Sequence, residues 1–95
     1  MDSSTPFGNE PFPIPIEDVL DLHSIHPRDV MEVVDAWLDE VYSAGFQSVR
    51  IIHGRGIGVQ REIVRSVLAK KKYIQTVQDA PPEAGGWGAT IVTIR

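Results

Sequence analysis

Two apolar segments, each ending in a histidine and each followed by a helical pattern, limit this chain to an alternating α/β fold. The segments cover residues 18–23 and 48–53, and their apolar pattern predicts a strand in each. Apolar residues at helical spacing follow from Pro27 to Ala44, and again from about Val59. In an open α/β sheet, ligands bind at the carboxyl ends of parallel strands. We therefore expect both histidines to face solvent at one binding edge.

The second half of the chain predicts two further strands. Tyr73 to Gln78 and Ala89 to Arg95 read as strands, the latter rich in β-branched residues, and a loop of proline and glycine separates them. The resulting order is β-α-β-α-β-β, with parallel pairing between the first two strands and a closing hairpin. Because two helices cover only one face of a four-stranded sheet, we expect a two-layer α/β sandwich with a mixed sheet.

The length of 95 residues suits one small domain. Four prolines within residues 1–16 predict an extended N-terminal arm, followed by a domain over residues 17–95. The absence of cysteine excludes disulfides and thiolate metal sites. No apolar run reaches the ~20 residues that cross a bilayer, and no signal-peptide pattern is present. We therefore expect a soluble, cytoplasmic protein that does not bind membranes.

The formal net charge of −4 hides a division along the chain. Residues 1–45 carry ten acidic side chains and one basic one, whereas residues 46–95 carry three acidic and eight basic ones. Local potential guides an anionic ligand more strongly than total charge does. The second half can therefore present a cationic face to a polyanion, although ordinary solvated surface charge gives the same count.

Asp21, His23 and His53 are the candidate catalytic residues for hydrolysis of a phosphodiester. That reaction needs proton transfer at the nucleophile and at the leaving oxygen, and an imidazole titrates near neutral pH. Asp21 either orients a histidine or binds a metal ion, such as a loosely held Mg²⁺ or Mn²⁺. The three residues also resemble a two-histidine, one-carboxylate metal site. In the plainer interpretation, Asp21 and His23 only pair with each other or cap the strand end.

Glycines and basic residues after the second strand are candidates for phosphate binding. Arg55 can grip a phosphate with two hydrogen bonds, and the amides of Gly54, Gly56 and Gly58 can point at the same anion. Further basic residues would hold the flanking backbone: Arg61, Arg65, Lys70, Lys71 and Lys72. The alternative is a tight turn between strand and helix, followed by a helix that ends in solvated lysines.

A few other residues have more local expected roles. Gly86 and Gly88 shape the loop before the last strand, with Trp87 either packed or exposed as a platform for a base. Trp37 falls on the apolar side of the first helix and is predicted to be in the core. His26 precedes Pro27 and is predicted to cap that helix.

Three motifs in order, over residues 15–95, resemble those of the Smr (small MutS-related) domain. They are Leu20-Asp21-Leu22-His23, then His53-Gly54-Arg55-Gly56-Ile57-Gly58 with Arg61, then Gly85-Gly86-Trp87-Gly88-Ala89-Thr90. Ser24 stands where the family usually has glycine. The resemblance implies a two-layer α/β fold similar to the C-terminal domain of a bacterial translation initiation factor. It also implies binding of double-stranded or branched DNA or RNA, with nicking of nucleic acid by several members.

Together, the residues and the resemblance predict an endonuclease that nicks DNA, branched DNA included, or structured RNA. The sequence leaves the oligomeric state open, with a monomer slightly favoured, and a chain that acts alone would have a single site and cut one strand at a time. Two other functions remain open. One is a catalytically silent DNA- or RNA-binding module, and the other is a protein-interaction domain that uses the acidic first helix.

Overall fold

The computed structural model describes residues 16–54 and 59–95. Its helices and strands confirm the predicted order, and two short 3-10 turns occupy the predicted proline- and glycine-rich loop. In order, the elements are β1 (Val19–Asp21), α1 (Pro27–Ser43), β2 (Ser48–Ile52), α2 (Val59–Leu68), β3 (Ile74–Asp79), η1 (Pro82–Ala84), η2 (Gly86–Gly88) and β4 (Ala89–Ile94).

The four strands form one mixed sheet in the order β1-β2-β4-β3. β1 pairs with β2 in parallel, and β3 pairs with β4 in an antiparallel hairpin, as predicted. β4 also pairs antiparallel with β2, from Ser48 opposite Thr93 to Ile52 opposite Ala89. The sequence did not indicate this central position for the last strand.

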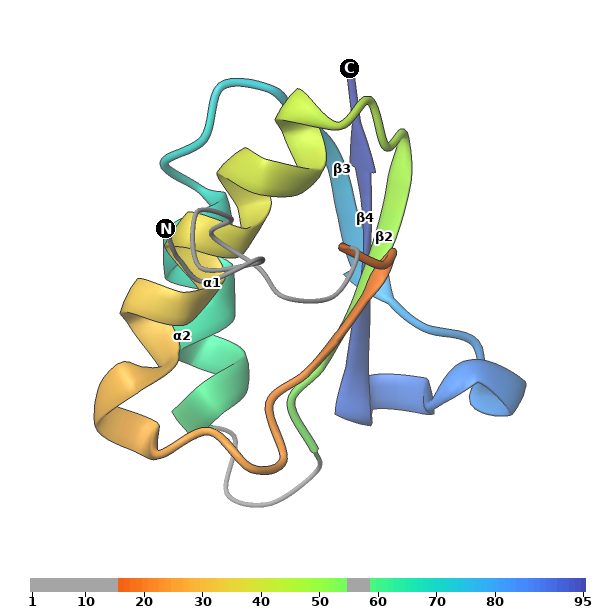
Figure 1. Ribbon diagram of the computed structural model, residues 1–95. Coiled ribbons are helices and arrows are strands. Elements are labelled where there is room, and N and C mark those ends of the chain that lie inside the picture. Colours follow the sequence, from red (N-terminus) through yellow and green to blue (C-terminus); the bar gives the residue numbers. More distant parts are fainter. Residues whose placement is uncertain (1–15, 55–58) are drawn as a thin grey trace, which may run out of the picture.

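Both helices lie on one face of the sheet, which confirms the two-layer α/β sandwich (Figure 1). The η1–η2 segment projects from the opposite side of the sheet (Figure 1). There the Arg50 guanidinium donates a hydrogen bond of 3.1 Å to the carbonyl oxygen of Ala84, which ties η1 to β2. The expected likeness to the C-terminal domain of a bacterial translation initiation factor stays a prediction.

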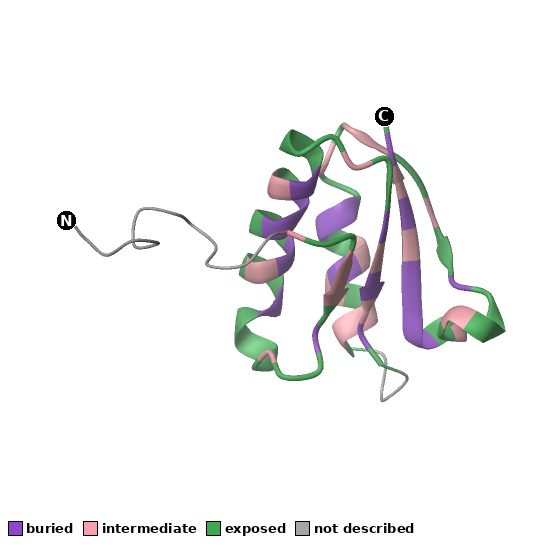
Figure 2. Cartoon of the chain, turned by 45° about the vertical axis from the view of Figure 1, so that its right-hand side comes forward, coloured by how far each residue is buried: buried purple, intermediate pink, exposed green. Residues whose placement is uncertain are grey.

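The core fills the space between the sheet and the two helices, where the buried residues gather (Figure 2). Alternate residues of β2 and β4 face it, because successive side chains of a strand point to opposite faces. Trp37 is 6% exposed and belongs to this core, as predicted. The other main contributors are Leu22, Val30, Val34, Leu38, Val41, Val49, Ile51, Val64, Val67, Leu68, Val92 and Ile94.

The start of α1 follows the capping signals in the sequence. The Nδ1 atom of His26 accepts a hydrogen bond of 3.2 Å from the backbone N–H of Arg28, and Pro27 occupies the first helical position. These contacts satisfy a free helical N–H and preset the backbone of the first turn. The predicted role of His26 as the helix cap is confirmed.

Two of the differences between predicted and observed element ends affect the predicted site residues. α2 ends at Leu68, because the N–H groups of Lys70 and Lys71 bond to carbonyls three residues back and tighten the chain into a turn. The lysines therefore follow the helix instead of closing it. β1 ends at Asp21, so His23 lies beyond the strand.

Residues 1–15 of the expected arm lie outside the described residues, and Ile16 packs against the core. Within residues 16–54 and 59–95, no helix has both the length and the apolar character needed to span a membrane.

Candidate functional site

The site predicted from the sequence lies at one end of the sheet. The carboxyl ends of β1 and β2 meet there, beside the start of β4, at the lower end of the sheet in Figure 1. Asp21 is in register with Ile52, and Ile52 is in register with Ala89. The three predicted motifs, far apart in sequence, are therefore brought to the same rim.

Asp21 and His23 form an exposed turn at the end of β1. The Oδ1 atom of Asp21 accepts a hydrogen bond of 2.9 Å from the backbone N–H of His23. Asp21 points away from the core because Leu20, its neighbour in the strand, packs against the core. This turn fixes the backbone of His23 while its side chain stays exposed to solvent.

His53 is buried, with 7% of its surface exposed, so the prediction of two solvent-facing imidazoles is wrong for this residue. The Nδ1 atom lies 3.0 Å from the carbonyl oxygen of Gly54, and the Nε2 atom lies 2.9 Å from the Thr90 hydroxyl. A carbonyl only accepts, so Nδ1 carries a proton, and in the neutral ring Nε2 accepts from Thr90. His53 continues the core-facing row of Val49 and Ile51, and that alternation explains its burial.

Burial also lowers the pKa of the His53 imidazole, and the nearby positive charges of Arg61 and Arg65 lower it further. The hydrogen bond to Gly54 and the charge of Asp79 act in the opposite direction without reversing the shift. The neutral form of His53 is therefore favoured inside the domain.

Gly54 and Gly88 join the second motif to the third. The carbonyl oxygen of Gly88 accepts hydrogen bonds from the backbone N–H groups of His53 (3.1 Å) and Gly54 (2.9 Å). Gly54 has φ +82°, a left-handed conformation that favours glycine. Trp87, next to Gly88 in η2, is 50% exposed. The Gly54 N–H, predicted to point at an anion, thus donates to Gly88 instead, and that prediction is wrong for Gly54. The other residues predicted for this phosphate site, Arg55, Gly56 and Gly58, lie outside the described residues.

Arg61 and Arg65, predicted to hold a nucleic-acid backbone, are both paired with Asp79. Each guanidinium lies 2.8 Å from the Oδ1 atom of that carboxylate. Hydrogen bonding from Arg61, together with the positive charge of both arginines, lowers the pKa of Asp79. Two cations thus share one anion at the end of β3, leaving an excess positive charge next to the buried His53.

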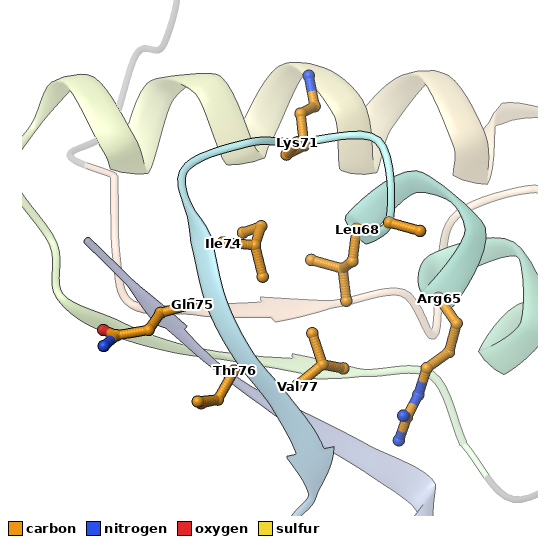
Figure 3. Close-up of a pocket in the computed structure, with 8 residues that line it drawn as sticks. Arg65, Leu68, Lys71, Ile74, Gln75, Thr76 and Val77 are labelled. Atoms are coloured by element: carbon orange, nitrogen blue, oxygen red, sulfur yellow. The ribbon is translucent and has the colours of Figure 1, made fainter.

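Lys71 does not form a phosphate-binding triplet with Lys70 and Lys72. Its ammonium group lies 2.7 Å from Asp35 and 3.0 Å from Asp39 on α1, and its side chain is only 14% exposed. The predicted triplet is wrong for Lys71, since the turn after α2 directs its side chain toward the acidic face of α1 (Figure 3). Lys70 and Lys72 remain exposed.

A hydroxyl group reinforces the contact of Lys71 with α1. The Tyr73 hydroxyl donates a hydrogen bond of 2.6 Å to Asp39, and the Tyr73 ring stacks on Tyr42 with centroids 4.1 Å apart. Hydrogen bonds from Tyr73 and Lys71 lower the pKa of Asp39, and burial raises that of Tyr73. This cluster fastens the turn after α2 to α1 and serves the fold.

Comparison with known proteins identifies the family. The sequence model of the Smr domain family matches residues 20–95 of this chain. This chain belongs to the Smr domain family. Over 76 residues it is 34% identical to the Endonuclease MutS2 of Thermus thermophilus and 41% identical to that of Streptococcus sanguinis. These alignments cover 80% of the chain but only 10% of each relative, so the chain spans about a tenth of the curated relatives' length.

Two solved Smr structures share the fold. The Smr domain of Thermus thermophilus MutS2 superposes with a TM-score of 0.76 at 33% identity, covering 83% of this chain and 99% of that domain. YdaL, a stand-alone small MutS-related protein from Escherichia coli, superposes with a TM-score of 0.71 at 29% identity, covering 85% of this chain and 66% of YdaL. The mixed sheet and paired helices are thus shared with Smr domains of known structure.

The described residues of this Smr domain contain no cluster of three or more metal-ligating side chains. A two-histidine, one-carboxylate site is not formed, since both ring nitrogens of His53 already face hydrogen-bond partners. Asp21 remains as a single exposed carboxylate, with one oxygen already bonded to the His23 amide.

Several residues that build the site were missed in the sequence. Thr90 could have been found, because it lies on the core-facing row of β4 with Val92 and is polar. The partnership of Asp79 with the two arginines carries no local signal, since 14 and 18 residues separate the partners.

Proposed function

We propose that this Smr domain binds nucleic acid at the rim formed by β1, β2 and β4 and cuts single phosphodiester bonds in DNA or structured RNA. The observation that carries the proposal is the exposed Asp21–His23 turn at the ends of two parallel strands. The name of the relatives, Endonuclease MutS2, supports the same activity.

His23 is the acid–base residue in this proposal. Its imidazole removes a proton from the nucleophile, which is water, or the neighbouring 2′-hydroxyl when the substrate is RNA. The nucleophile forms a bond to phosphorus, the bond to the leaving oxygen breaks, and that oxygen takes up a proton from His23 or from water. Asp21 positions the histidine, because its carboxylate holds the backbone N–H of His23.

His53 supports the site without exchanging protons with the substrate. Its ring is buried, and its two nitrogens join the backbone of Gly54 to the side chain of Thr90. This arrangement joins the end of β2 to β4. Positive charge beside His53 then attracts the phosphate backbone, and Arg61 and Arg65 contribute to it beyond what Asp79 neutralises.

A divalent ion, Mg²⁺ or Mn²⁺, is compatible with this proposal. Asp21 offers an exposed carboxylate at the rim, which suits an ion that keeps most of its water ligands. Such an ion would supply positive charge to the phosphate oxygens.

A second candidate function is a nucleic-acid-binding module without catalysis. The burial of His53 favours it, because only one of the two expected imidazoles remains available for proton transfer. A module of this kind binds DNA or RNA in a salt-sensitive manner and leaves every strand intact.

Cleavage of supercoiled plasmid and of structured RNA, in parallel tubes with Mg²⁺, Mn²⁺ or a chelator, tests the proposal. We expect wild-type protein to nick one of the substrates and His23→Ala to lose that activity. His26→Asn is the matched control, since it removes a nearby exposed imidazole while keeping a side chain that caps α1. Intact substrates with bound wild-type protein under all three conditions would assign the binding module instead.

A further inference from the structure

Trp87 is a large apolar side chain left half exposed, at 50%, although the other tryptophan of the chain, Trp37, is 6% exposed. An exposed indole beside a proposed binding rim differs from a scattered surface hydrophobe, since large aromatic groups are enriched where ligands bind. Its chemistry is that of a flat apolar surface with a donor N–H at one edge.

The backbone that carries Trp87 is held on both sides by hydrogen bonds. The N–H of Gly86 donates to Pro81 (3.0 Å), and the N–H of Gly88 donates to Gly85 (3.1 Å). Gly85, at φ +116°, has no room for a side chain, because an added Cβ would lie 3.0 Å from the Cβ of Ala89. The segment is therefore held in one conformation, and the protein loses little conformational entropy when a ligand binds to Trp87.

Trp87 and His23 leave the same end of the sheet. Asp21, Ile52 and Ala89 form one row across β1, β2 and β4. His23 lies two residues beyond Asp21, and Trp87 lies two residues before Ala89. Adjacent strands are about 4.8 Å apart, so the end of β1 that precedes His23 and the start of β4 that follows Trp87 are about 10 Å apart. Neighbouring nucleotides of one strand can bridge that separation.

We propose that Trp87 stacks on an unpaired base next to the phosphate at which His23 acts as the acid–base residue, so that single-stranded or locally unpaired nucleic acid is the substrate class. This inference rests on the proposed function. Every base offers a flat face to an indole, so stacking binds single strands without requiring a particular sequence. In an intact duplex those faces are already stacked on neighbouring base pairs, so no base face is available to stack on Trp87.

Tryptophan fluorescence tests the inference without requiring cleavage. We expect a single-stranded oligonucleotide of about 12 nucleotides, added with chelator present, to quench the emission of the wild-type protein, whereas its duplex form does not. Trp37→Phe removes the buried indole and leaves Trp87 as the only emitter. If that variant does not fold, the same titration of wild-type protein stands, because the Trp37 ring is shielded in the core.

Affinity measurements on variants complete the test. Trp87→Ala should weaken binding of the single strand about 10-fold or more, with Trp87→Phe between Ala and wild type, because stacking on an aromatic ring makes a large contribution per base. Tyr42→Ala is the matched control, since Tyr42 is a similarly exposed aromatic residue, 47% exposed, near the distant end of α1. It should leave binding unchanged.

The outcomes separate this inference from the proposed function. Equal loss of duplex and single-strand affinity in Trp87→Ala, or no loss in either, overturns the stacking role even when the wild-type protein cuts its substrate. Quenching by single strands with no cleavage overturns the endonuclease and leaves the stacking role in place. If neither the single strand nor the duplex binds, and the fluorescence of Trp87 does not change, both the stacking role and the proposed function are overturned.

Discussion

The Nε2 atom of His53 lies 2.9 Å from the hydroxyl oxygen of Thr90, inside the domain. The two residues belong to different motifs, one after β2 and one in β4, and neither side chain reaches the solvent to any large extent. His53, a candidate catalytic residue in the sequence, is therefore a buried residue whose side chain connects the end of β2 to β4.

Thr90→Val should lower the free energy of unfolding by about 1–3 kcal/mol, because the Nε2 atom of His53 loses its partner without much change in packing volume. In a His53→Leu background the same substitution should cost far less. Urea denaturation of the four proteins in this cycle measures the coupling. Equal costs in the two backgrounds would mean that the hydrogen bond does not contribute to stability.

Stability should fall as pH drops below about 6.5, because the unfolded histidine takes up a proton near that pH whereas burial lowers the pKa of folded His53. The loss should stop below the folded pKa. The pKa values of Asp39 and Asp79 are also lowered on folding. Their contribution to stability is lost only when these carboxylates are protonated, in the more acidic range.

Thermal denaturation between about pH 7.5 and pH 5.5 isolates the contribution of His53. His53→Gln should show a shallower dependence of the melting temperature on pH than the wild-type protein does. Parallel curves for the two proteins would show that another group is responsible.

His23→Ala should lower the cleavage rate by about 100- to 10,000-fold, because it removes the group that transfers the proton. Affinity for the uncut nucleic acid should stay within a few-fold of wild type, since phosphate contacts dominate binding. Single-turnover kinetics give the rate, and fluorescence anisotropy with chelator gives the affinity. A matching fall in affinity would indicate that the imidazole binds substrate without participating in proton transfer.

A monomer with one site should cut one strand of a plasmid at each encounter. We therefore expect open circles to accumulate before any linear product, in a time course followed on agarose gels. Light scattering on the same preparation establishes the oligomeric state. Linear product that appears first, from a protein shown to be monomeric, would contradict a single nicking site.

Asp79→Asn should strengthen binding of nucleic acid at low salt, because it frees Arg61 and Arg65 from the carboxylate that they share. The slope of log affinity against log salt should steepen by about 0.7–0.9 for each additional phosphate contact. Anisotropy titrations at several salt concentrations measure this slope. An unchanged slope would show that the two arginines serve only to hold β3 against α2.

The periodicity of apolar residues was sufficient to predict the element order and the two layers, while the central position of β4 and the contacts of the site depended on information that periodicity does not contain. α1 and β2 were located correctly because capping residues and continuous apolar runs are local signals. The pairing of Lys71 with Asp35 and Asp39 joins elements more than 30 residues apart, and only the tertiary structure creates it. His53 was the avoidable error, since two-residue alternation from Val49 and Ile51 already places it in the core.

The position of β4 has a consequence for how the chain acquires its structure during synthesis. Ala89–Ile94 is synthesised after the other three strands of this sheet, yet it separates β2 from β3 in the finished sheet. Until it emerges, both of those strands present unpaired edges that can bind chaperones or neighbouring nascent chains. The domain is therefore expected to complete its folding only after translation has passed Ile94, in one late cooperative step.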